Sequence, residues 1–122
     1  MKQEDKELLL IDLCGRLPYG VKGVEANTLC SLNTVTRFKS IVKNIEYKIE
    51  HLGFKPYLFP LSSMTEEQSM EFALLQVNTH KDGFLYVCDC ANMMKWLLKN
   101  HFDIYGLIEK GLAIDCTNLN IY

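Results

Sequence analysis

Residues 55–68 have the sequence KPYLFPLSSMTEEQ, and this stretch connects the two halves of the chain. Pro56 and Pro60 each fix a φ angle, and each lacks the backbone N–H that could donate a hydrogen bond. A proline also moves the residue before it toward extended backbone. We therefore expect residues 57–59 to be extended and to join two parts of one body rather than two domains.

The end of the same stretch predicts the start of a helix. Thr65 and Gln68 have the spacing of a capping box. In that motif the threonine hydroxyl accepts a hydrogen bond from the glutamine backbone N–H, and the glutamine side chain accepts one from the threonine backbone N–H. The predicted helix covers residues 66–76, and its apolar side chains are Met70, Phe72, Leu74 and Leu75.

Two elements are predicted before the connector. Residues 4–16 predict a helix, because apolar side chains recur there at the i, i+3, i+4, i+7 spacing of one buried face. Residues 28–32 predict a strand, since the region around them is rich in threonine, valine, leucine and glycine and lacks helix signals.

Residues 36–52 support two interpretations. Their apolar side chains fit one face of a helix that Gly53 could end. Residues 45–49, however, alternate between apolar and polar types, as in a half-buried strand. We favour a helical turn over 36–43 followed by a strand over 44–50, and a continuous helix is the alternative.

The predicted elements beyond residue 80 are short. In chain order they are a turn at 81–83, a strand over 84–88, a helix over 91–101, a helix over 104–110 and a strand over 112–114. Asp89 and Asp103 stand at the N-cap positions of the two helices, and Gly111 can end the second.

Composition and element order together indicate one α+β domain over residues 1–122. The chain has 122 residues, of which 48% are hydrophobic and 23% charged, as in ordinary globular proteins. Helices mixed with short strands, without successive βαβ units, predict a short-stranded antiparallel sheet and about four helices.

The same features bear on compartment and redox state. Apolar runs such as residues 8–11 are far too short to cross a bilayer, and the N-terminus lacks the pattern of a secretory signal. We therefore expect a cytoplasmic protein with no membrane partner. Five cysteines, an odd number, predict reduced thiols rather than a disulfide framework.

Candidate chemistry is sparse. Cys88 and Cys90 are separated by one residue, whereas structural zinc sites usually space their cysteines two to four residues apart. In a strand over 84–88 the two thiols would point to opposite faces. Cys90 would also stand at the start of the 91–101 helix, which could lower its pKa. A thiol or metal enzyme using these cysteines and His101 is our third hypothesis, but we expect no enzyme, no cofactor and no metal.

Aromatic residues suggest the leading hypothesis, which is a non-enzymatic protein that binds another protein. They come from the connector and from the last predicted helices, and they are Tyr57, Phe59, Trp96, Phe102 and Tyr105. If some of them form an exposed patch with a polar rim, that patch would mark a partner site. The alternative is that they fill one core.

A basic stretch over residues 37–55 suggests the second hypothesis, a nucleic-acid-associated factor. Its basic residues are Arg37, Lys39, Lys43, Lys48 and Lys55, and its aromatic residues are Phe38, Tyr47 and Phe54. Such a mixture can hold single strands by charge and stacking. However, a net charge of +3 over this stretch is more typical of a solvated face, and residues 61–122 carry a net charge of −4. Nucleic acid is therefore a less favoured partner than protein.

Three strings in the chain resemble a known family. They are LPYGVK (17–22), the connector (55–68) and NHFDIYGLIEKGLAID (100–115). The chain resembles a family of small uncharacterised proteins encoded by gut anaerobes and by the phages or prophages that live in them. The resemblance implies a phage or mobile-element origin, and it implies no activity, cofactor or catalytic residue.

Overall fold

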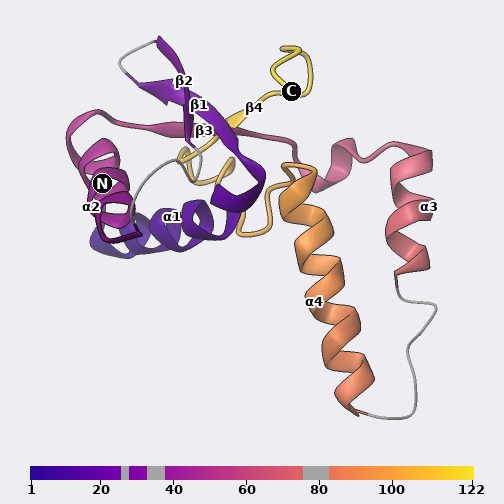
Figure 1. Ribbon diagram of the computed structural model, residues 1–122. Helices are drawn as coiled ribbons and strands as arrows, with labels where there is room; N and C mark the ends of the chain where they lie inside the picture. Colours follow the sequence, from indigo (N-terminus) through magenta and orange to yellow (C-terminus); the bar gives the residue numbers. More distant parts are fainter. Residues whose placement is uncertain (26–27, 33–37, 76–82) are drawn as a thin grey trace.

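The computed structural model describes residues 1–25, 28–32, 38–75 and 83–122 (Figure 1). Its helices are α1 (Gln3–Arg16), α2 (Phe38–His51), α3 (Glu66–Leu74) and α4 (Gly83–Lys99). Its strands are β1 (Val21–Glu25), β2 (Thr28–Leu32), β3 (Lys55–Leu58) and β4 (Ile114–Asp115). The predicted α+β class with four helices is confirmed.

The four strands form one mixed sheet in the order β2-β1-β3-β4. Strand β1 is antiparallel to β2 and to β3, as predicted, but β3 and β4 are parallel. Parallel pairing needs a long crossover, which the chain between β3 and β4 provides because it includes α3 and α4. The sheet is therefore mixed, not purely antiparallel.

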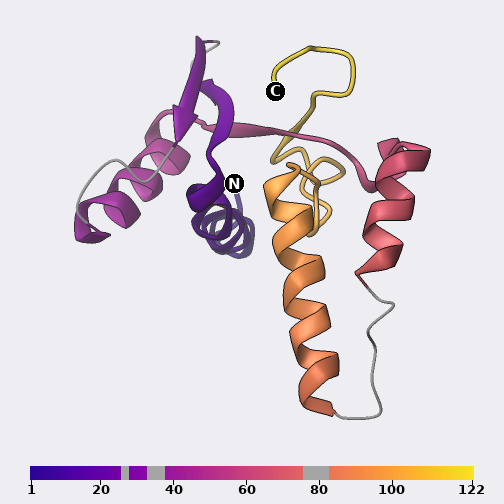
Figure 2. The ribbon, with the colours of Figure 1, turned by 45° about the vertical axis from the view of Figure 1, so that its right-hand side comes forward.

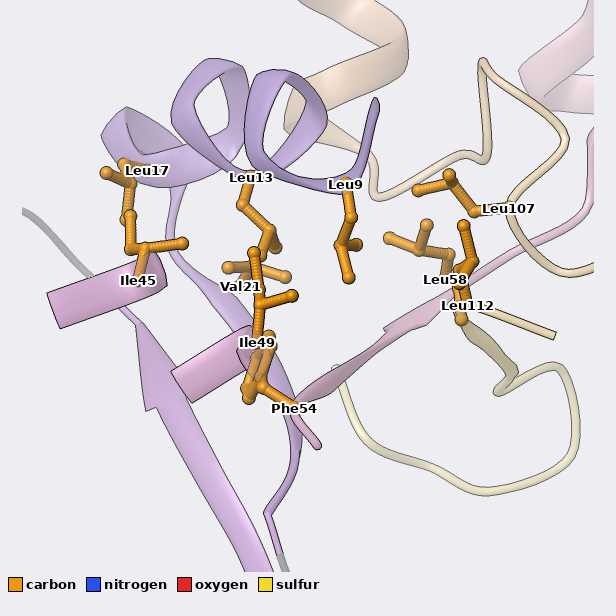
Figure 3. Packing of buried hydrophobic residues seen from close by; sticks show 11 residues of the cluster. Leu9, Leu13, Leu17, Val21, Ile45, Ile49, Phe54, Leu58, Leu107 and Leu112 are labelled. Atoms are coloured by element: carbon orange, nitrogen blue, oxygen red, sulfur yellow. The ribbon is translucent and has the colours of Figure 1, made fainter. Parts of the chain in front are cut away.

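Helices α1 and α2 pack against the sheet and enclose the core (Figure 3). Leucines on one face of α1 meet side chains from α2, β1, β3 and the segment after α4. The buried members of this cluster are Leu9, Leu13, Leu17, Val21, Ile45, Ile49, Phe54, Leu58, Leu107, Leu112 and Ala113. Gly23 of β1 is needed here, since a Cβ atom on it would lie 2.4 Å from the Phe54 ring.

Four of the predicted local structures are confirmed. Helix α1 covers the predicted 4–16, and β2 matches the predicted strand over 28–32. Residues 57 and 58 are extended in β3, and Phe59 continues as an isolated bridge to Phe102. The capping box is formed as predicted: Oγ1 of Thr65 accepts from the Gln68 N–H at 3.1 Å, and Oε1 of Gln68 accepts from the Thr65 N–H at 2.9 Å. The helix that follows ends at Leu74, two residues before the predicted end.

The predicted strand over 44–50 is wrong, and the continuous-helix alternative is right for residues 38–51, while residues 36 and 37 lie outside the described part of the chain. Ile45 and Ile49, four residues apart, are buried, whereas Tyr47 between them is exposed. A strand would have placed all three on one face, so the helical spacing decides. Gly53, with φ of 62°, follows the end of α2, as the alternative required.

The predicted strand over 84–88 is also wrong, because α4 begins at Gly83 and continues to Lys99. Asp89 therefore lies inside a helix and not at an N-cap. A helix pairs its backbone groups within the segment, whereas a strand over 84–88 would need a neighbouring strand. Part of the predicted turn, residues 81–82, lies outside the described residues.

After α4, the predicted capping contact of Asp103 is formed, but the predicted helix over 104–110 is not. Residues 104–110 form turns, not a helix. Asp103 nevertheless acts on the backbone as a cap does, since its carboxylate accepts from the N–H groups of Leu107 at 2.9 Å and Ile108 at 3.0 Å. The closing strand is β4 at Ile114–Asp115, slightly later than the predicted 112–114.

In the part of the chain that the structure describes, no helix has both the length and the apolar character needed to cross a membrane.

Candidate partner-binding surface

Helices α3 and α4 together form a helical arm that extends away from the sheet and from α1 (Figure 2). The two helices meet through Phe72 and Trp96, whose ring centroids lie 5.4 Å apart. The indole Nε1 of Trp96 also donates a hydrogen bond of 3.1 Å to Oε1 of Glu71. Gln68 and Leu75, one helical turn on either side of Phe72, are half-buried with it. This face of α3 is therefore the one turned toward α4.

An aromatic cluster forms the base of the helical arm. The rings of Trp96 and Phe102 are stacked, with centroids 5.7 Å apart and planes 13° apart. The ring of Phe59 lies 6.1 Å from that of Phe102. The backbone reinforces this contact, because Phe59 N–H donates to His101 O and Asp103 N–H donates to Phe59 O, both at 2.8 Å. Three of the five predicted aromatic residues are thus brought together, with Phe102 buried among them.

The other two predicted aromatic residues lie apart from this cluster. The carbonyl oxygen of Tyr57 accepts a hydrogen bond of 2.9 Å from the Tyr122 hydroxyl, which itself accepts one of 2.9 Å from the Lys22 N–H. Tyr122 thus bridges β1 and β3 beyond the last paired residues of these strands. Tyr105 is exposed in the turns after α4. The five aromatic side chains therefore do not form one continuous surface.

A buried ion pair anchors the helical arm to α1. Arg16 Nε lies 2.7 Å from Oδ2 of Asp12, and Arg16 Nη2 lies 3.0 Å from Oδ1. Nη2 also donates to the carbonyl oxygen of Phe102 at 2.5 Å. Both side chains are fully buried. Burial raises the pKa of Asp12, and the hydrogen bonds from Arg16 oppose that shift.

His101 follows the end of α4 in an unusual conformation. Its φ of 65° lies in the left-handed region, which residues other than glycine rarely adopt. Its ring stacks on Tyr122, with centroids 3.5 Å apart and planes 9° apart. Burial, together with the charges of Arg16 and Lys22, lowers the pKa of His101 to about 4. The imidazole is therefore neutral at neutral pH.

The structure does not bring the candidate thiols to this histidine. Cys90 lies in the middle of α4, roughly three helical turns from residue 101, so the predicted helix N-terminus beside it is absent. Cys116 is buried, and burial together with Asp115 raises its pKa to about 11. The side chain of Cys88 lies outside the described residues. Among the side chains that the structure describes, no group of three His, Cys, Asp or Glu residues is placed to hold a metal ion.

Large apolar side chains are exposed on both helices of the arm. Met70 and Leu74 of α3 are 65% and 64% exposed, and Met94 of α4 is 43% exposed. Helix α3 buries none of its side chains, and the described part of α4, from residue 90 to residue 99, likewise contains none. A helix as apolar as α4 usually buries a face against a neighbour. The arm therefore presents apolar surface that nothing in the described chain covers.

A second exposed residue extends this surface onto α1. A Cβ atom on Gly15 would lie 3.6 Å from Cδ1 of Leu98, so α1 and α4 meet at these two residues. Ile11, which is 58% exposed, precedes Gly15 by four residues, and Met94 precedes Leu98 by four. Each therefore lies on the same face of its own helix as the residue that makes this contact. We call Ile11, Gly15, Met94 and Leu98 the apolar corner. The sequence contained no signal for it beyond the apolar character of the two helices, because the meeting of α1 and α4 is a tertiary contact.

The predicted basic stretch is less continuous in space than in sequence. Lys48 forms an ion pair with Glu25, and Phe54 is buried in the core. Lys43 and Lys55 are exposed on different elements. Arg37 and the side chain of Lys39 lie outside what the structure describes. Tyr47 is exposed and lies 4.9 Å from the ring of His51.

Three hollows on the described surface are small. Their volumes are about 170, 190 and 230 Å³, whereas ligand sites usually measure ~300–1,000 Å³. The second lies between Lys22, His101 and Tyr122. Two of the side chains that line it bond within the chain, since the Tyr122 hydroxyl bridges two strands and Lys22 Nζ donates to Ile121 O at 2.9 Å. Nδ1 of His101, which also lines it, is buried and has no hydrogen-bond partner among the described residues.

Comparison of the chain with protein-family models, with curated proteins and with solved structures gives no match.

Proposed function

We propose that this chain is a non-enzymatic protein-binding protein, and that the helical arm with the apolar corner is its binding surface. The observation that supports this proposal is the exposure of Met94 and Ile11 on two helices that meet at an angle (Figure 1). Contiguous exposed apolar surface with a polar rim is typical of protein interfaces. Methionine suits such a surface, because its flexible side chain adapts to the shape of a partner.

The charges near this surface favour a protein over a nucleic acid. Helix α3 carries Glu66, Glu67 and Glu71 and has no basic residue, and although α4 carries Lys95 and Lys99, the two helices together have a net charge of −2. These carboxylates would repel phosphates, which nucleic-acid binding must instead neutralise. Acidic residues around apolar ones are compatible with a protein partner that carries a basic rim.

Site-specific photocrosslinking tests the proposal. A benzophenone amino acid replaces Met94 in one variant and Tyr47, which is also exposed but lies on α2, in the control. Both variants are expressed in the organism that encodes the chain, irradiated and recovered under denaturing conditions. We expect a discrete protein adduct from position 94 and none from position 47.

Other outcomes would contradict the proposal. A nuclease-sensitive adduct from position 47 would support the nucleic-acid hypothesis instead. Equal labelling at the two positions, or no protein adduct from position 94, would show that the apolar corner is not a binding surface.

A further inference from the structure

The chain exposes more surface than a monomer of its mass should. Its accessible surface is 8073 Å² for a mass of 14.1 kDa. A folded monomer of this mass is expected to expose about 6,700 Å². The excess is on the order of 1,300 Å², which lies in the range that one subunit loses in an obligate dimer, about 1,000–2,500 Å².

Helix α4 projects from the rest of the described molecule (Figures 1 and 2). Helix α4 has 17 residues and is therefore roughly 25 Å long. Its contact with α1 is near its C-terminal end, at Leu98, and its N-terminal half extends well beyond α1 and the sheet in both views (Figures 1 and 2). Residues 83–90 of this half have the sequence GFLYVCDC, which contains one charge. A short helix is rarely stable in water without a packed apolar face.

We propose that the occupant of the apolar corner is a second copy of this chain, bound about a two-fold axis with the two α4 helices antiparallel. This inference rests on the proposed function and names the partner of that surface. Each chain has the shape of an L, formed by α1 and α4. When two such shapes are related by a two-fold axis, the N-terminal half of each α4 lies in the apolar corner of the other copy.

Two features favour a second copy over an unrelated protein. The dimer needs the apolar corner and the projecting half of α4, and both are on the same chain. A two-fold arrangement therefore covers both surfaces in each copy. It is also closed, so it does not continue into a filament of subunits. The antiparallel arrangement also opposes the two helix dipoles, which is favourable.

Sedimentation equilibrium of the full chain, from low to high micromolar concentration, tests the dimer. We expect a species of twice 14.1 kDa that dissociates on dilution. Met94→Glu and Ile11→Glu place a charge in the corner from two different helices, and each should raise the dimer dissociation constant by roughly tenfold or more. Tyr47→Glu is the control, because Tyr47 is 55% exposed but lies on α2, outside the helical arm and the apolar corner, so it should leave the constant unchanged.

Circular dichroism shows whether each variant is folded, and Met94→Gln replaces Met94→Glu if the charged variant is not. A monomer at every concentration would overturn the inference, and so would a dimer that Met94→Glu and Ile11→Glu do not weaken. The proposed function fails separately. If the purified chain is a monomer but position 94 crosslinks a different protein, only the identity of the partner is wrong; if position 94 crosslinks no protein at all, both proposals are wrong.

Discussion

Nη2 of Arg16 donates a hydrogen bond to the carbonyl oxygen of Phe102, across 86 positions of sequence. This bond joins the C-terminal end of α1 to the residue around which the base of the helical arm packs. Asp12 holds the same guanidinium from the preceding turn of α1 through two further bonds. The direction in which the arm extends therefore depends on a charge that is completely buried.

Replacing Arg16 with methionine should destabilise the fold strongly. The substitution leaves the carboxylate of Asp12 buried without its counter-charge, and removal of one partner from a buried pair typically costs about 3–5 kcal/mol. The free energy of unfolding from urea titration measures this effect. In the double variant Arg16→Met/Asp12→Leu no charge is left buried, so it should be more stable than the single variant. A single variant that loses less than about 1 kcal/mol would show that the pair does not anchor the arm.

The pH dependence of stability should contain a contribution from His101. Its pKa is about 4 in the folded chain and about 6.5 in the unfolded chain, so the unfolded state binds the proton more readily. The stability that the neutral imidazole contributes is complete above pH 6.5, and it is lost as the pH falls toward about 4. Asp12, whose pKa is raised, contributes the opposite slope in the acid range.

His101→Asn isolates this contribution, because asparagine also tolerates a positive φ but does not titrate. Urea titrations at several pH values between 4 and 7 should show a smaller loss of stability for the variant than for the natural chain. Asp12 is present in both, so its slope cancels in the comparison. Identical slopes would mean that His101 titrates normally in the folded state.

Two glycines should respond in opposite ways to the same substitution. In Gly23→Ala the new Cβ atom would lie 2.4 Å from the Phe54 ring and 2.6 Å from the carbonyl oxygen of Lys55, so β1 or the core must shift. Such overpacking typically costs about 1–3 kcal/mol. In Gly15→Ala the new atom is in ordinary contact with Leu98, and alanine is favoured over glycine in a helix by about 1 kcal/mol. Thermal unfolding should therefore give a lower Tm for the first variant and an equal or higher one for the second.

The sequence predicted those elements whose signals are local. The capping box at Thr65 and Gln68 was correctly predicted because both of its hydrogen bonds are made within one turn. The alternation of residues 45–49 led to the wrong prediction of a strand. Ile45 and Ile49 are four residues apart, which fits both the period of two of a strand and the i, i+4 spacing of a helix. Only the position of Tyr47, exposed on α2 while both isoleucines are buried, separates the two interpretations.

The candidate surface could not be predicted in the same way. The apolar character of residues 83–99 is visible in the sequence, but a strand over 84–88 and a helix are both compatible with it. Arg16 shows the same limit. Its spacing from Asp12 permits an ion pair on a helix surface, whereas its burial depends on the carbonyl of Phe102, which is distant in sequence. Contacts of this kind follow from tertiary packing, so the corner formed by Ile11 and Met94 had no local signature.

Removing the capping box should loosen α3 without affecting α1. Helix α3 has nine residues and no buried side chain, so its stability depends on its cap and on the contact between Phe72 and Trp96. Thr65→Ala removes the hydroxyl that accepts from the Gln68 N–H, and loss of such a cap typically costs about 1 kcal/mol. Amide hydrogen exchange measured by NMR should then be roughly fivefold faster in α3.

Ser69→Ala is the matched control, because it removes an exposed hydroxyl from the interior of the same helix and alanine is the better helix former. It should slow exchange in α3 slightly or leave it unchanged. If Thr65→Ala instead accelerated exchange in α1 and α3 equally, the arm would be part of the same cooperative unit as the core, and the cap would contribute to the stability of the whole chain.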